Sequence, residues 1–195
     1  MTALILAAAI TLSPMSQVDS MSGTCSTWHS WRVPPETVRV FRLHRRGSKV
    51  PRRVETWSFR RYVAAVMASG AWSPRVRESG KVGAIAIHGW AMWMVRHHQP
   101  GYSLEGRCYD VTDSDQFIRG DMRPWSKVPA RTMELVRITW PVTLMKNGHR
   151  FRTGWSGGEG DSWHLGEDQV RRLAERGWGW RRIIHRLLRP VEIVE

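Results

Sequence analysis

The segment 109–120 concentrates side chains that could do chemistry. It places Asp110, Asp113 and Asp115 close together and follows them directly with Gln116. Carboxyl groups can donate or accept a proton at a reacting bond, which is the basis of general acid–base catalysis. The same carboxylates can also cap turns or pair with arginines. The cluster therefore predicts either a catalytic centre or an ion-paired turn.

A glycine-rich stretch, 154–161, is the second candidate for a functional segment. Its composition predicts an irregular loop, in which Ser156, Gly157, Gly158 and Glu159 follow one another. The backbone N–H groups of such a loop could hold a sugar oxygen, or the glycines could only form a tight turn. Ser156 has no nearby His–Asp pair in the sequence, which argues against a serine nucleophile.

The elements that must position these groups follow from hydrophobic periodicity. Residues 37–43 alternate between apolar and polar and predict a strand, and residues 50–56 predict its partner. Ser58 is expected to cap a helix over 59–69, which Gly70 ends.

A second, long helix is expected over residues 77–97, where small and apolar residues lie on one side. The remaining predicted elements are a helix at 126–138, a hairpin around Asn147–Gly148, helices at 166–176 and 180–188, and a closing segment at 191–194. This order predicts an α+β fold: one domain with a small mixed or antiparallel sheet, two packed central helices and two short C-terminal helices. We assign residues 1–35 to an apolar and irregular lead-in and residues 36–195 to the domain.

The composition is strongly basic and rich in tryptophan. The 195 residues include 30 Lys and Arg against 17 Asp and Glu, a formal net charge of +13, and 12 tryptophans. A surface of this charge attracts polyanions such as nucleic acid, anionic wall polymers or acidic lipid headgroups. Some of the indoles are expected in the core, including Trp90 and Trp93, whereas Trp72, Trp155 and Trp163 are expected to offer flat faces to sugars.

The first residues leave two alternatives open. Residues 3–12 are apolar, too short to span a bilayer, and resemble the centre of an export signal without its basic leader. They predict either a degenerate signal or a buried N-terminal segment. Cys25 and Cys108 form no metal-binding pattern, and their spacing leaves open whether they pair. No metal or cofactor is predicted.

Five motifs in order resemble the stage II sporulation protein D family. Residues 60–68 resemble the entry into the family's first helix, a tyrosine before small apolar residues, and residues 81–91 resemble its second helix, with a lysine, small residues and an aromatic. The acidic segment 109–120 resembles the family's acidic segment, and residues 155–158 resemble its serine–glycine–glycine loop. Residues 166–184 resemble its closing segment through Gly166, Gln169, Ala174 and Gly177. The likeness runs from about Thr37 to Glu195.

Members of that family are lytic transglycosylases, which cut the glycan strands of peptidoglycan without water. The resemblance implies a protein outside the cytoplasm that faces the cell wall. Cleavage of a glycosidic bond requires a carboxylic acid that protonates the leaving oxygen. In the family this acid is a glutamate at the end of the first helix, and the equivalent position here is Gly70.

The resemblance also implies a set of substrate-binding residues. These are Lys81, His88, Gln116, Trp155, Ser156, Gly157, Gly158, His164 and Gln169. His88 stands where the family has an arginine, and His164 is displaced by one residue from the family's histidine.

Three functions remain open from the sequence. The first is a noncatalytic derivative that binds peptidoglycan glycan strands or serves as a structural part, with protein assembly partners. The second is an active lytic enzyme with a relocated acid, for which Asp113 is favoured over Asp110 and Glu159, with Glu78 and Asp161 as further candidates. The third is a phage virion component or a nucleic-acid binder that works through its basic surface.

Overall fold

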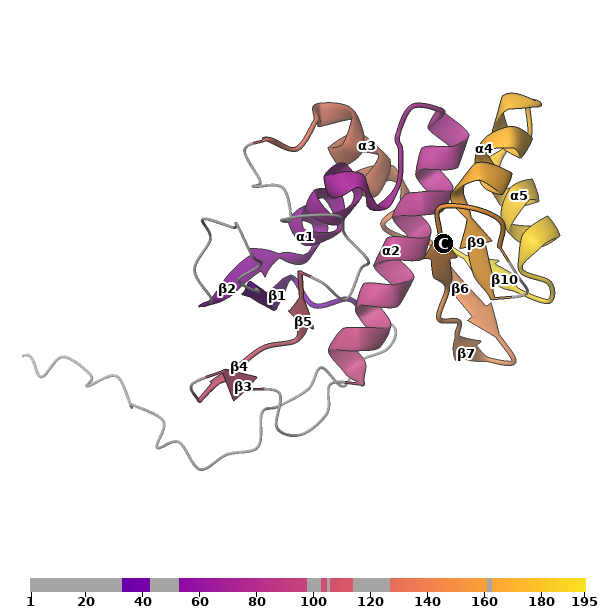
Figure 1. The fold of residues 1–195 in the computed structure, drawn as a ribbon. Helices are drawn as coiled ribbons and strands as arrows, with labels where there is room; N and C mark the ends of the chain where they lie inside the picture. Colours follow the sequence, from indigo (N-terminus) through magenta and orange to yellow (C-terminus); the bar gives the residue numbers. More distant parts are fainter. Residues whose placement is uncertain (1–32, 43–52, 98–102, 105, 114–126, 161–162) are drawn as a thin grey trace, which may run out of the picture.

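The computed structural model describes residues 33–42, 53–97, 103–104, 106–113, 127–160 and 163–195. Their elements form the predicted α+β domain, with five α-helices and several small sheets. The long helix α2 (Arg77–Arg96) passes through the middle of the molecule. One three-stranded sheet and one two-stranded sheet lie with α1 on one side of it, and the other two sheets lie with the two C-terminal helices on the other side (Figure 1).

The first sheet has the order β2-β1-β5. Strands β1 (Thr37–Arg42) and β2 (Arg53–Ser58) pair antiparallel, with Thr37 opposite Ser58. Strand β5 (Val111–Thr112) joins β1 in parallel, with Val40 opposite Val111. The acidic segment therefore begins as part of this sheet.

Helix α1 (Phe59–Val66) continues into a π-helical turn, η1 (Met67–Ala71). Ser58 occupies the N-cap position as predicted, but its side chain makes no capping hydrogen bond. Gly70 has φ +93°, a left-handed conformation that ends the helix and that glycine adopts without strain. The predicted end of the helix at Gly70 is confirmed.

Helix α2 is largely buried, and its small residues permit close contacts. Trp72, which is fully buried, lies directly over Gly83, where a Cβ would be 2.3 Å from the indole. The Trp72 Nε1–H donates to Ser79 Oγ at 3.1 Å. A side chain at position 83 would displace this indole, so the glycine is required by packing. Trp72 was predicted to stack on sugars; it is a core residue instead.

The remaining elements lie on both sides of α2 (Figure 1). They are β3 (Ser103–Leu104), β4 (Arg107–Cys108), α3 (Ala130–Thr139), β6 (Thr143–Lys146), β7 (His149–Arg150), β8 (Gly154–Ser156), β9 (His164–Gly166), α4 (Glu167–Glu175), α5 (Trp180–Leu187) and β10 (Glu192–Val194). The second sheet has the order β10-β6-β7, and Asn147 and Gly148, both at positive φ, form the predicted turn between β6 and β7.

Among the described residues, no helix is both long and apolar enough to cross a bilayer. Cys108 forms a disulfide, and the other cysteine of the chain, Cys25, lies outside the described residues.

Candidate functional site

The two described aspartates of the acidic segment are bound to arginines of β1. Asp110 accepts hydrogen bonds from the Arg39 backbone N–H at 2.7 Å and from its guanidinium at 2.5 and 3.1 Å. The hydrogen bond between the two side chains raises the pKa of Arg39, and partial burial, which acts to lower this pKa, does not offset it. Asp113 is 1% exposed and lies 3.3 Å from Arg42 Nε. Neither carboxylate has the open surface that a glycan would need, so the predicted catalytic roles of Asp110 and Asp113 are not supported.

Gly70, at the position of the family's acid, is exposed. A Cβ at this position would meet no atom within 4 Å, so space is available for a larger side chain. Strand β5 is held to α1 at Tyr62, whose hydroxyl donates to Thr112 O at 3.2 Å. Because Asp110 and Asp113 are engaged by arginines of β1, neither is a free acid that could replace the glutamate of the family.

The other candidate acids are also engaged. Glu159 is exposed and forms an ion pair with Arg172. Glu78 accepts hydrogen bonds from Lys81 Nζ at 2.6 Å and from the Trp180 backbone N–H at 2.9 Å. Partial burial acts to raise the pKa of the Glu78 carboxyl, but these hydrogen bonds and the nearby positive charges outweigh burial, and the pKa is lowered. A carboxylate of lowered pKa is poorly suited to act as a general acid at neutral pH.

His88 is a core residue. It is 3% exposed, and its ring stacks on Trp140 at 4.2 Å and meets Phe59 edge-on at 5.6 Å. Burial, together with the charges of Arg150 and Arg60, lowers the pKa of His88 to about 3. The imidazole is therefore neutral at physiological pH and shielded from solvent. The predicted substrate-binding role of His88 is wrong, because a substrate could not reach the buried ring.

The glycine-rich segment is more regular than its composition predicts. Gly154–Ser156 form β8, which pairs in parallel with β9, so that Gly154 lies opposite His164. A Cβ on Gly154 would be 2.1 Å from the His164 ring, which explains the glycine. Ser156 donates to Glu159 O at 3.1 Å and closes a short turn. This prediction of an irregular loop was wrong for β8 and holds only for the residues after it.

Gly157 and Gly158 lie in the exposed part of this turn, where a Cβ at either position would meet no atom within 4 Å. They remain accessible to a ligand. Gln169 is half-buried on α4, and Lys81 lies at the opposite end of α2 from Trp93. Gln116, Asp115 and Asp161 lie outside the described residues. The predicted binding residues that the structure describes therefore do not all converge on one hollow.

A different group of side chains does converge, over the C-terminal half of α2. The Arg152 guanidinium carbon lies 4.4 Å from the Trp93 ring centre, 4.9 Å from that of Trp90 and 5.4 Å from that of Trp163. Trp155 meets Trp90 edge-on at 6.0 Å. We call these five residues the tryptophan–arginine cluster.

The cluster has a buried base and an open edge. Trp155 is 6% exposed and forms the base, so its ring offers no free face to a sugar, contrary to prediction. Trp163 is 40% exposed and forms the edge, with His164 behind it at 3.8 Å between ring centres. Trp93 is half-buried and stacks on His97 at 4.6 Å. Of the predicted binding residues, Trp155 and His164 belong to this region in supporting positions.

The electrostatics of the cluster favour an anion. A narrow cavity of about 30 Å³ lies beside it, and the described residues that line it are mostly arginine and aromatic and include no acid. They are Gly89, Met92, Trp93, Arg96, His97, Arg150, Phe151 and Arg152. Burial, reinforced by the charge of Arg96, lowers the pKa of Arg150 to about 10. In the described part of the chain no carboxylate reaches Arg152, whose contacts are the three indole rings. A guanidinium in this setting can direct its N–H groups to a carboxylate or phosphate.

Sequence reasoning missed Arg152 and placed Trp93 in the core. The spacing of Trp90 and Trp93 puts both indoles on neighbouring positions of one helix face, which is a usable signal. No local pattern links them to Arg152, which reaches them from the segment after β7. No group of three or more metal-ligating side chains occurs among the described residues.

The chain matches no family model, no curated protein and no solved structure.

Proposed function

We propose that this protein binds the glycan strands of peptidoglycan without cutting them, as a noncatalytic relative of the sporulation protein D lytic transglycosylases. The observation that carries the proposal is the tryptophan–arginine cluster. It combines an exposed indole, Trp163, with a guanidinium that no carboxylate of the described chain neutralises.

The chemistry of the cluster suits an acidic polysaccharide. Indole rings present flat apolar faces that can cover the C–H face of a sugar ring. Peptidoglycan also carries carboxylates on its peptide stems, and a guanidinium binds such groups through charge-assisted hydrogen bonds. An uncharged glycan would gain from Trp163 but not from Arg152. The cluster therefore supports binding of a glycan that bears acidic groups.

The state of the carboxylates supports a noncatalytic role. Asp110 and Asp113 are bound to β1 arginines, and Glu78 is bound to Lys81. Gly70, at the position of the family's acid, carries no proton donor. Loss of a general acid typically reduces the rate by 10²–10⁴-fold. The disulfide at Cys108 further supports an oxidising compartment outside the cytoplasm, in contact with the wall.

The direct test is co-sedimentation with purified sacculi, followed by analysis of the supernatant for soluble glycan fragments. We expect the protein to pellet with the sacculi and to release no anhydro-muropeptides. Trp163→Ala should reduce the pelleted fraction several-fold, whereas Val194→Ala, at another exposed large hydrophobic residue, should not. Release of anhydro-muropeptides would show an active enzyme, and failure of the wild-type protein to pellet would contradict the proposal.

A further inference from the structure

The pair α4–α5 presents a basic face that the glycan proposal does not use. The helices are joined by a short turn in which Gly177 has φ +82°. Trp180, Ile183 and Ile184 anchor α5 in the core. Its outer side carries Arg181, Arg182, His185 and Arg186, all of them exposed. Helix α5 lies at the edge of the molecule, on the opposite side of α2 from α1 (Figure 1).

The charge of this face is of one sign. The segment 176–189 contains five arginines and one histidine and no acidic residue. Arg181 is neutralised by an ion pair with Glu195. Arg182 lies over the Trp178 ring at 3.8 Å, and neither Arg182 nor Arg186 forms an ion pair with any described acid. These two residues are one helical turn apart, so their guanidinium groups line the same stripe of α5.

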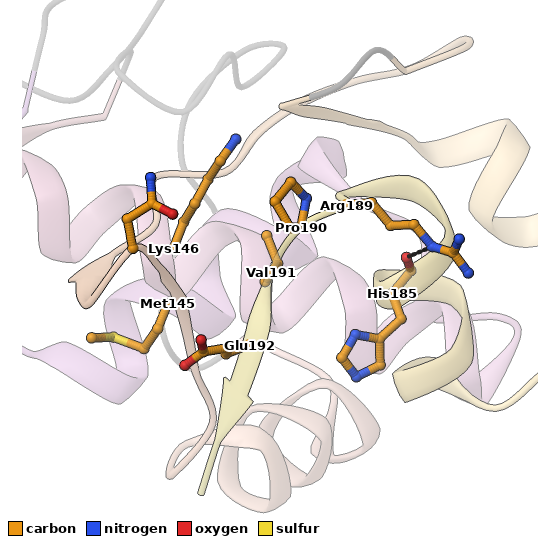
Figure 2. A pocket seen from close by; sticks show the side chains of 8 residues that line it. Met145, Lys146, His185, Arg189, Pro190, Val191 and Glu192 are labelled. Atoms are coloured by element: carbon orange, nitrogen blue, oxygen red, sulfur yellow. Dashed lines mark hydrogen bonds between the residues drawn. The ribbon is translucent and has the colours of Figure 1, made fainter.

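The basic face continues into a hollow between α5 and the β6–β7 turn (Figure 2). The hollow measures about 320 Å³ and is flanked by Lys146, His185 and Arg189. Arg189 Nε donates to His185 O at 3.1 Å, drawn as the dashed line in Figure 2, which fixes the arginine at the end of the helix. Glu192 is the one carboxylate in its lining. The two cationic side chains, Lys146 and Arg189, extend the positive surface beyond α5.

The kind of polyanion follows from what this face lacks. Among the described residues the exposed large hydrophobic side chains are Val33, Trp163 and Val194, and none belongs to α5. A helix that binds a membrane surface needs apolar side chains to insert between lipids.

Proteins that bind single-stranded nucleic acid use free aromatic faces for base stacking. Here Arg182 covers Trp178 and Arg181 covers Trp180 at 4.4 Å. What remains is a rigid row of cations, which suits the phosphates of a double helix.

We propose that the outer face of α5, together with Lys146 and Arg189 at the adjoining hollow, binds the phosphate backbone of double-stranded DNA without reading its sequence. Arginine suits this task because its planar fork can make two parallel hydrogen bonds to one phosphate. The proposal is independent of the tryptophan–arginine cluster, which belongs to α2, β8 and the segments beside β8.

The test measures binding of the full chain to a fluorescent duplex of random sequence by anisotropy, between 50 and 200 mM salt. Each phosphate contact contributes about 0.9 to the slope of log K against log salt. We expect Arg182→Gln/Arg186→Gln to lower that slope by about 2. The matched control is Arg171→Gln/Arg172→Gln on α4, which removes the same charge from arginines already paired with Asp168 and Glu159. The control should change the slope by less than half as much.

Several results would overturn the proposal. Equal loss in both double variants would mean that only net charge matters. Tighter binding to single-stranded DNA, or to vesicles of phosphatidylglycerol and phosphatidylcholine, would assign the face to another partner.

Lys146→Gln should lower the slope of log K against log salt by about 1, and an unchanged slope would also contradict the proposed footprint. Lys146→Gln also serves as the test if the α5 double variant fails to fold, as judged by circular dichroism. Pelleting with sacculi should be unchanged in the α5 variant, so that failure of one proposal leaves the other testable.

Discussion

Arg42 and Asp113 form an ion pair inside the protein. Arg42 Nε lies 3.3 Å from Asp113 Oδ2, and the side chains are 4% and 1% exposed. Arg42 also lies 4.0 Å from Glu55 and over the Trp57 ring at 5.7 Å. The pair links the last residue of β1 to the residue directly after β5. Its position makes Asp113 part of the scaffold rather than a proton donor for a substrate.

Asp113→Asn should therefore destabilise the fold. The substitution leaves the Arg42 guanidinium buried with a weakened partner, and breaking a buried pair typically costs about 3–5 kcal/mol. Because Glu55 remains nearby, we expect a loss of about 3 kcal/mol in the free energy of unfolding, measured by urea denaturation. Glu134→Gln, at the exposed pair with Arg77, should change that free energy by less than about 1 kcal/mol. A stable Asp113→Asn protein that had lost a glycan-cutting activity would contradict this structural role.

Gly70→Ala should destabilise the protein although there is room for the methyl group. The cost arises from φ +93°, which L-residues rarely adopt, and should be about 1 kcal/mol in thermal or urea unfolding. Gly157→Ala is the control, since its Cβ would also meet no atom within 4 Å and its φ is not in the left-handed region. If both variants were equally stable, Gly70 would not be required by the backbone.

His88 should make stability depend on pH. Its pKa is about 3 in the folded protein, because of burial and the charges of Arg150 and Arg60, against about 6.5 when unfolded. Since the unfolded chain takes up the proton first, stability falls as pH decreases from about 6.5 towards 3. Between pH 7 and pH 5 we expect a loss of about 2 kcal/mol from this residue.

The comparison of wild type with His88→Phe isolates that contribution. The phenyl ring should occupy the space between Phe59 and Trp140 and remove the titration. Urea denaturation at pH 7 and pH 5 should then show a smaller difference for the variant. An equal pH dependence in both proteins would mean that the imidazole is accessible to protons in the folded state.

The sequence was sufficient for the local elements of the fold. Helix α2 was predicted over residues 77–97 and spans Arg77–Arg96, because its pattern of small and apolar residues lies within the segment itself. The turn at Asn147 and Gly148 was predicted because Asn–Gly favours positive φ at both positions. The parallel pairing of β5 with β1 was not predicted, because the two strands are distant in the chain. The pairing of β9 with β8 was not predicted, because the glycine-rich composition of 154–161 indicated an irregular loop.

The site was predicted less well, for a physical reason. The acidic cluster suggested a catalytic role for Asp113, and the family resemblance implied a binding role for His88, but tertiary packing buried both side chains. Conversely, no local sequence pattern indicated a role for Arg152. Its proposed role depends on its contacts with three indole rings, two on α2 and one on the residue before β9. A motif records which groups are present, whereas burial and long-range contacts decide what those groups can do.

The central claim is that the tryptophan–arginine cluster holds an acidic glycan. The most direct measurement is the affinity for purified sacculi of wild type, Arg152→Gln and the control Arg171→Gln, all at one salt concentration. A hydrogen bond to a charged group contributes about 1.5–3 kcal/mol, so Arg152→Gln should weaken binding by about 10-fold or more. Arg171→Gln should bind as the wild type does. Equal affinity of all three proteins would contradict the assignment of the glycan site to this cluster.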